Sequence, residues 1–355
     1  MGYPRLISNK EAIIHNVKKI SQMCHERGIE LTGVVKVTKG EPSLAKLYLE
    51  NGVDIIGDSR IANIKRMKMA GVNGPFMLLR IPMPSEIEDL VKYVDITLVS
   101  ELKTVEIIGK IAMDKGKRQK IIYMVDVGDL REGVWFENAV DEVTKASQIK
   151  GVELYGIGTN LGCYGGVVPD TENMNLLSDI ARKIRNKGTN FKIVSGGNTA
   201  AVYLIENNTL PKEINGYRLG ESIILGTDTT NNRSFPFLRQ DTFTLEAEII
   251  ELKTKPSVPY GKIGRDAMGR VPVFEDFGNR LKAIIAIGEQ DIQPDGMIPL
   301  EKGIKVLHAS SDHMVLDVTE FNGELDIGSI LKFRLTYGAL LRSMTSEYVE
   351  KIWDF

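Results

Sequence analysis

Apolar stretches of strand length alternate with amphipathic segments along the first two-thirds of the chain. The intervening segments carry apolar residues at three- and four-residue spacing, which is typical of helices packed on one face. Strands are predicted at 31–36, 54–56, 76–79, 96–99, 121–126, 152–158, 192–195 and 217–219. Helices are predicted from a Ser8/Glu11 capping box to Gly28 and at 42–51, 59–70, 84–93, 101–115, 138–147, 171–186 and 198–206.

Repeated strand–helix units with right-handed crossovers build a parallel sheet. Eight of each predict the α/β class and a (β/α)₈ TIM barrel. An open doubly wound sheet is the alternative, because counting strands does not separate the two. After Asn232 the pattern changes to alternating β-branched stretches separated by turn residues. We therefore expect a barrel over 1–232 and a smaller all-β domain over 233–355, which the first few residues could also join. Its strands are predicted at 242–252, 281–287, 304–307, 314–318 and 330–335.

Composition narrows the class of protein without defining its chemistry. A hydrophobic content of 43%, a charged content of 26% and a net charge of -2 are ordinary for a soluble globular chain. Basic residues are nowhere concentrated with aromatic ones, and no apolar run is long enough to span a bilayer, so neither nucleic acid nor membrane is an expected partner. The N-terminus lacks the layout of a signal peptide. Cys24 and Cys163 lie far apart without metal-ligand spacing, which favours reduced thiols, a cytoplasmic location and no metal.

Polar residues gather where the predicted strands end, and in a parallel barrel the chemistry lies at those carboxyl ends. Lys36 ends the first strand, and burial there lowers the pKa of a lysine, as a Schiff-base lysine requires. A lysine that simply reaches water is the plainer interpretation of this residue alone. Later strands end at Arg131 in 126-DVGDLREG-133, at Asn160 and at Arg218.

The stretch 195-SGGNT-199 is the best candidate for a phosphate site. Its glycines allow backbone N–H groups to approach an anion, and a helix begins directly after it. A plain glycine turn with an Asn or Thr helix cap is the alternative. A lysine, a phosphate cradle and two arginines on one face of a barrel suit pyridoxal phosphate.

These motifs, taken in order, resemble those of the alanine racemase family of pyridoxal-phosphate enzymes, and within it the ornithine racemase branch. The resemblance implies that Lys36 in 34-VVKV-37 holds the cofactor and that Arg131 contacts its phenolic oxygen and the substrate. It also implies that Arg218 faces the pyridine nitrogen. Further cofactor contacts are implied at Asn160, Asn198, Thr199, Gly220 and Ser222.

The predicted second domain carries three more stretches of this resemblance. The motif 258-VPYG-261 points to Tyr260 as the second catalytic base opposite Lys36. Asp312 in 310-SSDHMVLDV-318 corresponds to a substrate-side aspartate, and Tyr337 in 335-LTYG-338 to a tyrosine that reaches the phosphate. In relatives the catalytic tyrosine comes from the partner subunit, so a homodimer with composite sites is expected. A turn tyrosine and a surface acid are the plainer interpretations of Tyr260 and Asp312.

Two positions depart from the family pattern. Thr38-Lys39-Gly40 follow the lysine strand, where relatives usually have a tyrosine that helps hold the phosphate. Asn160 replaces a histidine, and asparagine can hydrogen-bond but cannot relay a proton. Both departures fit a branch with its own substrate.

The resemblance implies an isomerase of amino-acid metabolism that racemises a small amino acid, ornithine first, with lysine, alanine or a broad range as alternatives. A decarboxylase of the same barrel type is a more distant alternative, disfavoured because those enzymes usually place an acid where Arg218 stands. A non-catalytic pyridoxal-phosphate carrier is disfavoured by the full-sized second domain.

Overall fold

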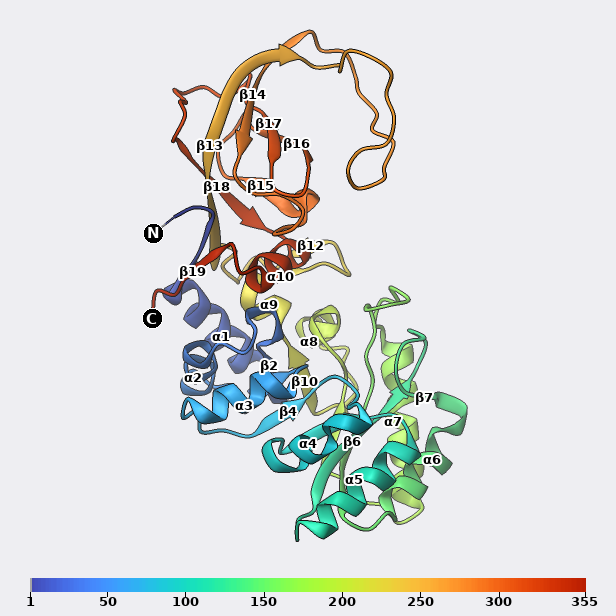
Figure 1. Cartoon of the computed structure of the whole chain (residues 1–355). Helices are drawn as coiled ribbons and strands as arrows, with labels where there is room; N and C mark the ends of the chain where they lie inside the picture. The colour runs from blue at the N-terminus through green and yellow to red at the C-terminus, as the bar shows by residue number, and fades with distance from the viewer. Residues whose placement is uncertain (1) are drawn as a thin grey trace. The chain divides into compact units, whose positions relative to one another are not determined.

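A computed structural model describes residues 2–355 of the chain, which divides into two compact units (Figure 1). The barrel unit is Ile13–Arg239, and the β unit combines residues 2–12 with Gln240–Phe355. The boundary lies later than the predicted one at 232/233. The reason is a short hairpin, β11 (Thr227–Asp228) with β12 (Arg233–Ser234), which keeps residues 233–239 with the barrel.

The barrel unit is a closed parallel barrel, and the open sheet is excluded. Its strands follow the order β5-β4-β3-β2-β10-β9-β8-β6, and pairing of β5 with β6 closes the ring. Strand β7 (Val134–Trp135) is added beside β6. The eight barrel strands are β2 (Glu30–Val34), β3 (Ile55–Asp58), β4 (Phe76–Leu78), β5 (Ile96–Val99), β6 (Gln119–Asp126), β8 (Val152–Gly158), β9 (Ile193–Ser195) and β10 (Gly216–Leu219).

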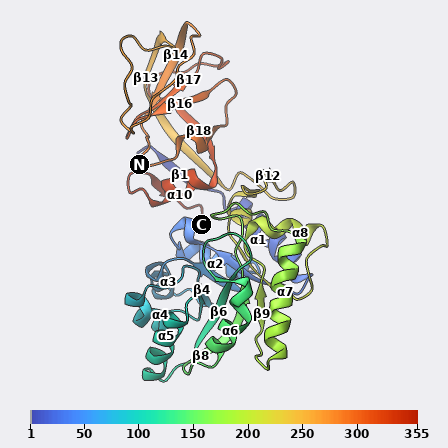
Figure 2. The ribbon, with the colours of Figure 1, turned by 90° about the vertical axis from the view of Figure 1, so that its right-hand side faces the viewer.

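Helices surround this ring (Figure 2). The first is capped by Asn9, whose Oδ1 accepts from the Ala12 N–H at 3.1 Å, so the predicted Ser8/Glu11 capping box is wrong. Ser8 instead ends strand β1. One short helix, α9, was not predicted. The helices are α1 (Lys10–His25), α2 (Pro42–Glu50), α3 (Ile61–Met69), α4 (Ile87–Tyr93), α5 (Leu102–Asp114), α6 (Ala139–Ser147), α7 (Thr171–Asn186), α8 (Val202–Glu206) and α9 (Glu221–Leu225), with 3₁₀ turns η1 (Lys36–Thr38), η2 (Pro84–Glu86), η3 (Phe136–Asn138) and η4 (Thr199–Ala201).

The barrel has a packed apolar core rather than an open channel. Side chains from several strands form one buried cluster. Burying each such side chain stabilises the fold by roughly 1.5–3 kcal/mol. The barrel is therefore a rigid frame for the loops at its carboxyl end. The cluster consists of Ile55, Met77, Ile96, Leu98, Ile122, Met124, Tyr155 and Ile193.

The β unit is a mainly antiparallel sheet in the order β15-β18-β13-β14-β17-β16, and β1 joins β13 to β19. The all-β expectation missed one helix, α10 (Tyr337–Thr345). It also missed strand β15 and the two terminal strands, and the pairing of the terminal strands joins parts of the chain more than 340 residues apart. The strands are β1 (Arg5–Ser8), β13 (Phe243–Pro256), β14 (Asn279–Ile285), β15 (Met297–Pro299), β16 (Lys305–Ala309), β17 (Met314–Asp317), β18 (Ile330–Leu335) and β19 (Glu350–Ile352), with a 3₁₀ turn η5 (Pro294–Gly296).

A long loop between β13 and β14, residues 257–278, extends away from this sheet (Figure 1) and is called the arm below. Its shape is fixed by Asp266, whose carboxylate accepts from the Met268 and Arg270 backbone N–H groups at 2.9 and 2.8 Å and from Arg270 Nε at 2.8 Å. His308 Nε2 of β16 also contacts this carboxylate, at 3.0 Å. The arm is therefore tied to the sheet and keeps a defined form.

No helix within residues 2–355 combines the length and the apolar character that crossing a bilayer requires.

Candidate active site

Lys36 lies just beyond the strand that was predicted to contain it. Strand β2 ends at Val34, and Lys36 opens the 3₁₀ turn η1. The turn is closed by Thr38, whose hydroxyl donates to the Val35 carbonyl at 2.9 Å, and by Lys39 in a left-handed conformation at φ 56°. The predicted strand end was thus two residues too late, and the correction leaves Lys36 at the carboxyl end of the barrel.

The amine of Lys36 stands in a charged environment. Its side chain is accessible to solvent, yet surrounding protein removes enough hydration to lower its pKa below the ordinary value of 10.5. The positive charge of Arg131 lowers the pKa further, whereas Cys163, Asp58 and Glu132 act in the opposite direction. A larger share of the amine is therefore neutral near pH 7 than in a free lysine, so it is a better nucleophile and proton acceptor.

This lowered pKa predicts the pH dependence of cofactor capture by the apoprotein. Only the neutral amine attacks an aldehyde, so the capture rate should rise with pH and level off below the pH 10.5 midpoint of an ordinary lysine. Stopped-flow absorbance with pyridoxal phosphate measures this midpoint. Arg131→Ala should move the midpoint upward, because it removes a cation. A wild-type midpoint equal to that of a lysine peptide would contradict the assigned environment.

Arg218 lies on β10, the strand next to β2, and is almost fully buried. Its Nη2 donates to the Thr159 carbonyl at 2.6 Å, and its Nη1 donates to the Ser195 hydroxyl. Burial lowers the pKa of Arg218 to about 10, with Glu132 and Cys163 opposing this shift. The guanidinium stays charged at neutral pH. It is a buried cation at the barrel end, and its role toward a cofactor ring stays a prediction.

Asn160 and Asn198 form one hydrogen-bonded unit at the ends of β8 and β9. Asn198 Nδ2 donates to Asn160 Oδ1 at 3.0 Å and to the Leu161 carbonyl at 2.8 Å. Asn160 Nδ2 contacts Cys163 Sγ at 2.9 Å, so the exposed thiol belongs to the same cluster. Asn198 Oδ1 also caps η4 through the Ala200 N–H at 2.8 Å. The Asn helix cap that was the alternative for this stretch is therefore present, and the same Asn198 side chain also contacts Asn160.

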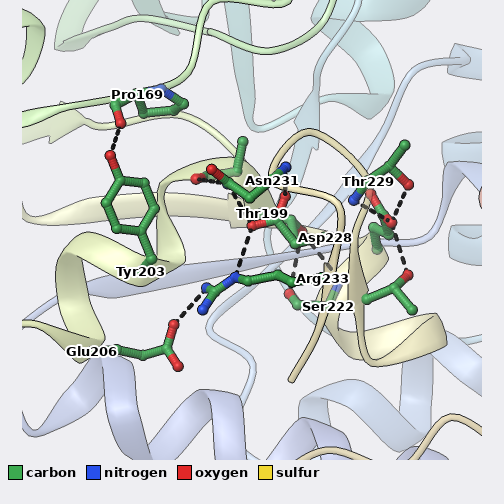
Figure 3. A network of polar contacts seen from close by, with 12 residues as sticks. Pro169, Thr199, Tyr203, Glu206, Ser222, Asp228, Thr229, Asn231 and Arg233 are labelled. Carbon is green, nitrogen blue, oxygen red and sulfur yellow. Dashed lines mark hydrogen bonds and ion pairs between the residues drawn. The ribbon is translucent and has the colours of Figure 1, made fainter. Parts of the chain in front are cut away.

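Thr199, Gly220 and Ser222 meet where η4 and α9 begin. The Thr199 hydroxyl lies 3.2 Å from the Ser222 hydroxyl and accepts from the Ser222 N–H at 3.1 Å (Figure 3). Gly220 precedes α9 and lies against Val34, since a Cβ there would be 3.1 Å from the valine Cβ. The two hydroxyls thus lie side by side where the short helical segments η4 and α9 begin, and hydroxyl groups are able to donate hydrogen bonds to a phosphate.

A polar network holds this candidate phosphate site in place (Figure 3). Asn231 Nδ2 donates to the Ala200 carbonyl at 2.9 Å and to Asp228 Oδ2 at 2.7 Å. Arg233 links Asp228 to Glu206 of α8. The β11–β12 hairpin and the turn before it are thereby fastened to η4, which contains Thr199, and to the end of α8.

Arg131 is carried by a tightly wound loop after β6. The side chain of Arg131 is exposed and pairs with Glu132 through two hydrogen bonds. The neighbouring Asp129 is buried and accepts from four backbone N–H groups of the loop after β8, those of Gly162, Cys163, Tyr164 and Val167. Asp129 therefore binds the Arg131 loop to the Cys163 loop.

Removing Asp129 should destabilise the barrel end strongly. Asp129→Ala strands four backbone donors, so we expect it to lower the free energy of unfolding by about 3 kcal/mol. Urea unfolding of the two proteins measures the difference. Asp114→Ala, an exposed acid at the end of α5, is the matched control and should change stability by less than about 0.5 kcal/mol. A loss for Asp129→Ala no larger than the control's would contradict the role given to Asp129.

The three candidates of the β unit occupy separate elements. Tyr260 lies on the arm with a relative side-chain exposure of 107%. Asp312 lies in the exposed turn between β16 and β17, where a hydrogen bond from His313 Nδ1 at 2.9 Å lowers the pKa of the carboxyl. Tyr337 begins α10 and is half-buried. Their roles toward a cofactor or substrate stay predictions.

The barrel residues fit pyridoxal phosphate. Lys36 offers an amine with a lowered pKa, and Arg218 offers a buried charge with donors beyond the two it uses. The buried hydroxyl of Thr159, beside Arg218, has no hydrogen-bond partner within the described chain, as expected of a site that takes up a polar ligand. Thr199 and Ser222 supply hydroxyls for the phosphate.

Comparison with known proteins identifies the family of this chain. The family model for the N-terminal domain of alanine racemase matches residues 8–228. A lysine racemase of Thermotoga maritima is 51% identical over 355 residues, covering 100% of this chain and 99% of the relative. An ornithine racemase of Acetoanaerobium sticklandii is 40% identical over 351 residues, covering 98% and 99%. The solved alanine racemase of Clostridium difficile 630 has the same fold, with a TM-score of 0.77, 20% identity and coverage of 99% and 96%.

The fold, the family model and these relatives define a pyridoxal-phosphate enzyme of the barrel-plus-β-domain type. The chain belongs to the alanine racemase family. Its similarity to the lysine and ornithine racemases extends over 100% and 98% of its length, whereas alanine racemases of Caldanaerobacter subterraneus and Clostridium tetani align with 56% and 41% of it.

Several residues of the candidate site escaped sequence reasoning. Asp129 and Glu132 lie inside the predicted Arg131 motif, but their buried or paired state depends on loop geometry. Thr159 and Ser195 were noted only as strand ends, although they accept from Arg218. Cys163 was used only to judge redox state. A signal existed for Asp129, because an acid in a glycine-containing loop after a barrel strand can accept from nearby backbone.

Proposed function

We propose that this protein is a pyridoxal-phosphate-dependent racemase that interconverts the L and D forms of ornithine. The observation that carries the proposal is the placing of Lys36, with its lowered pKa, beside Arg131 at the barrel end that also holds Arg218. The ornithine racemase relative supports the substrate. Lysine is the alternative substrate, and the lysine racemase relative, which is 51% identical, supports it. Either choice makes the substrate a basic amino acid.

Racemisation needs one proton removed from the α-carbon and another delivered from the opposite face. Pyridoxal phosphate, when bound, makes that proton acidic by spreading the resulting negative charge into its ring. Lys36 Nζ is the base on one face, and Tyr260 Oη is the base on the other. In one direction one of these two groups starts deprotonated and removes the proton, while the other starts protonated and delivers one. In the reverse direction Lys36 and Tyr260 exchange these roles.

The arginines and hydroxyls orient the reactants. Arg131 binds the carboxylate of the substrate and the phenolic oxygen of the cofactor, since a guanidinium presents paired donors in one plane. Arg218, charged and buried, would disfavour protonation of a cofactor ring nitrogen held next to it. This residue would thereby favour racemisation over transamination. Thr199 and Ser222 hold the phosphate, with Tyr337 as a further contact and Asp312 on the substrate side.

The catalytic unit is a homodimer in which the arm carries Tyr260 to the barrel of the second copy. The arm exposes an unusual density of apolar side chains for a solvated loop, which marks an interaction surface. These are Tyr260, Ile263, Met268, Val271, Val273, Phe274 and Phe277. Both cysteines are unpaired, which supports a cytoplasmic location.

Sedimentation equilibrium tests the homodimer. Val273, 91% exposed on the arm, is replaced by Lys, and Met69, 77% exposed at the end of α3, receives the same change as a control. Val273→Lys should shift the protein toward monomer and lower racemisation in parallel, whereas Met69→Lys should do neither. A wild-type monomer that racemises at full rate would overturn the composite site.

Chiral chromatography tests the reaction and its substrate. The purified holoenzyme is incubated separately with L-ornithine, L-lysine and L-alanine, and the D product and released carbon dioxide are measured. The proposal predicts D-ornithine, a smaller or comparable yield of D-lysine, little D-alanine and no carbon dioxide. Carbon dioxide without D product would identify a decarboxylase. Faster racemisation of alanine than of both basic substrates would overturn the substrate class.

A further inference from the structure

Glu132 contacts Arg131 on a loop whose backbone is fixed. Asp126 Oδ1 accepts from the Gly128 N–H at 2.8 Å, and Leu130 holds a left-handed φ of 57°, which a non-glycine residue adopts rarely. A Cβ on Gly133 would lie 2.6 Å from the Asp126 nitrogen, so only glycine fits there. The backbone of residues 131 and 132 therefore has little freedom. What remains to be fixed is the long side chain of Arg131.

Both carboxylate oxygens of Glu132 are committed to that side chain. Arg131 Nε donates to Oε2 and Nη2 donates to Oε1, so the two planar groups meet as a fork. Such a pair fixes the direction of the guanidinium as well as its position. The Glu132 side chain is 17% exposed and that of Arg131 is 42% exposed. The carboxylate is thus the more enclosed partner, and the guanidinium is the one presented outward.

The charges around the pair agree with a local role. The negative charge of Glu132 acts to raise the pKa of Arg218 and that of Lys36. Glu132 therefore interacts electrostatically with both of these cationic residues as well as with Arg131. The nearby Asp129 cannot take this part, because its carboxylate accepts from backbone N–H groups of the loop after β8. Glu132 is therefore the acid in this loop that is free to orient a side chain.

We propose that Glu132 is a positioning residue, which holds the guanidinium of Arg131 in the direction needed to bind the substrate carboxylate and the cofactor. The inference rests on the proposed function, because that function gives Arg131 its ligands. It adds a second requirement, namely that Arg131 binds these ligands well only while it is paired with Glu132.

Arginine labelling of the apoprotein tests this pairing without any reaction. Phenylglyoxal attacks guanidinium groups, and a fork with a carboxylate protects them. In Glu132→Gln the peptide containing Arg131 should be labelled about fivefold faster than in wild type, because one charge-assisted bond pair is lost. Glu132→Asp, which keeps the charge, should fall between the two. Labelling of Arg280, which is paired with Asp317 and Glu320, is the internal reference and should not change.

Steady-state kinetics with ornithine completes the test. Glu132→Gln should raise KM about tenfold, with a smaller effect on kcat, and the double variant Arg131→Ala/Glu132→Gln should be no worse than Arg131→Ala alone. Asp141→Asn, which breaks an exposed ion pair with Lys187, is the matched control and should leave both constants unchanged.

Two results would overturn the inference. If Glu132→Gln leaves the labelling of Arg131 unchanged, or if the two losses multiply in the double variant, Glu132 does not act through Arg131, and the proposed function stands. If wild type racemises but Arg131→Ala keeps the wild-type KM, Arg131 has no ligand to be positioned for, and both the inference and that part of the proposed function fail.

Discussion

Replacing Lys36 with alanine should abolish racemisation while leaving the protein folded. The loss should be at least about 10³-fold, because a general base alone contributes 10²–10⁴-fold and the cofactor attachment is lost as well. The side chain is solvent-accessible and opens a turn held by Thr38 and Lys39, so the free energy of unfolding should change by less than about 0.5 kcal/mol. Chiral assay of the cofactor-supplemented variant measures the first effect, and urea unfolding measures the second.

Lys39→Asn is the matched control for this variant. Lys39 is an exposed lysine of the same turn, and its φ of 56° suits asparagine. The control should retain the bound cofactor and most of the activity. If Lys36→Ala kept a substantial fraction of wild-type activity, the residue would be neither base nor cofactor anchor.

Tyr260→Phe should have the second-largest effect, a loss of racemisation of about 10³-fold. The phenol is fully exposed in the chain, so removing its hydroxyl should leave the melting temperature unchanged. The two-base scheme predicts a more specific signature. In D₂O the variant should still exchange the α-hydrogen of one enantiomer through Lys36, while inversion to the other enantiomer nearly stops. Proton NMR of ornithine measures exchange, and chiral chromatography measures inversion.

Tyr348→Phe, which removes another well-exposed hydroxyl of the β unit, is the control and should leave exchange and inversion untouched. Equal loss of exchange from both enantiomers in Tyr260→Phe would show that the tyrosine supports binding instead of moving a proton. Unchanged racemisation in both directions would remove the second base from the scheme altogether.

The barrel could be predicted because its strands have a recognisable apolar pattern in the sequence. Parallel strands are buried on both faces, so stretches such as 121–126 and 152–158 are almost continuously apolar. The strand ends were predicted less accurately, as at Lys36, because the first strand stops at Val34 and a 3₁₀ turn begins at Lys36. Strands β1 and β19 escaped prediction because their pairing joins the two ends of the chain, and no local pattern encodes that contact.

Some parts of the candidate site could likewise be predicted from the sequence, and others could not. Lys36, Arg131 and Arg218 could be found because strand ends in a barrel must converge, whatever the details of packing. The pairing of Arg131 with Glu132 could not be predicted, because it depends on the left-handed φ of Leu130 and on the turn at Gly133. The Thr159 hydroxyl, which has no hydrogen-bond partner among residues 2–355, likewise could be noticed only once the burial of Arg218 was known.

The most direct test of the covalent claim is peptide mass spectrometry of the borohydride-reduced holoprotein. Reduction fixes the cofactor to the amine that carries it. The proposal predicts a single pyridoxyl-phosphate adduct on the peptide containing Lys36, absent from Lys36→Ala. An adduct on a different lysine, or none after incubation with excess cofactor, would contradict the central claim that Lys36 binds pyridoxal phosphate.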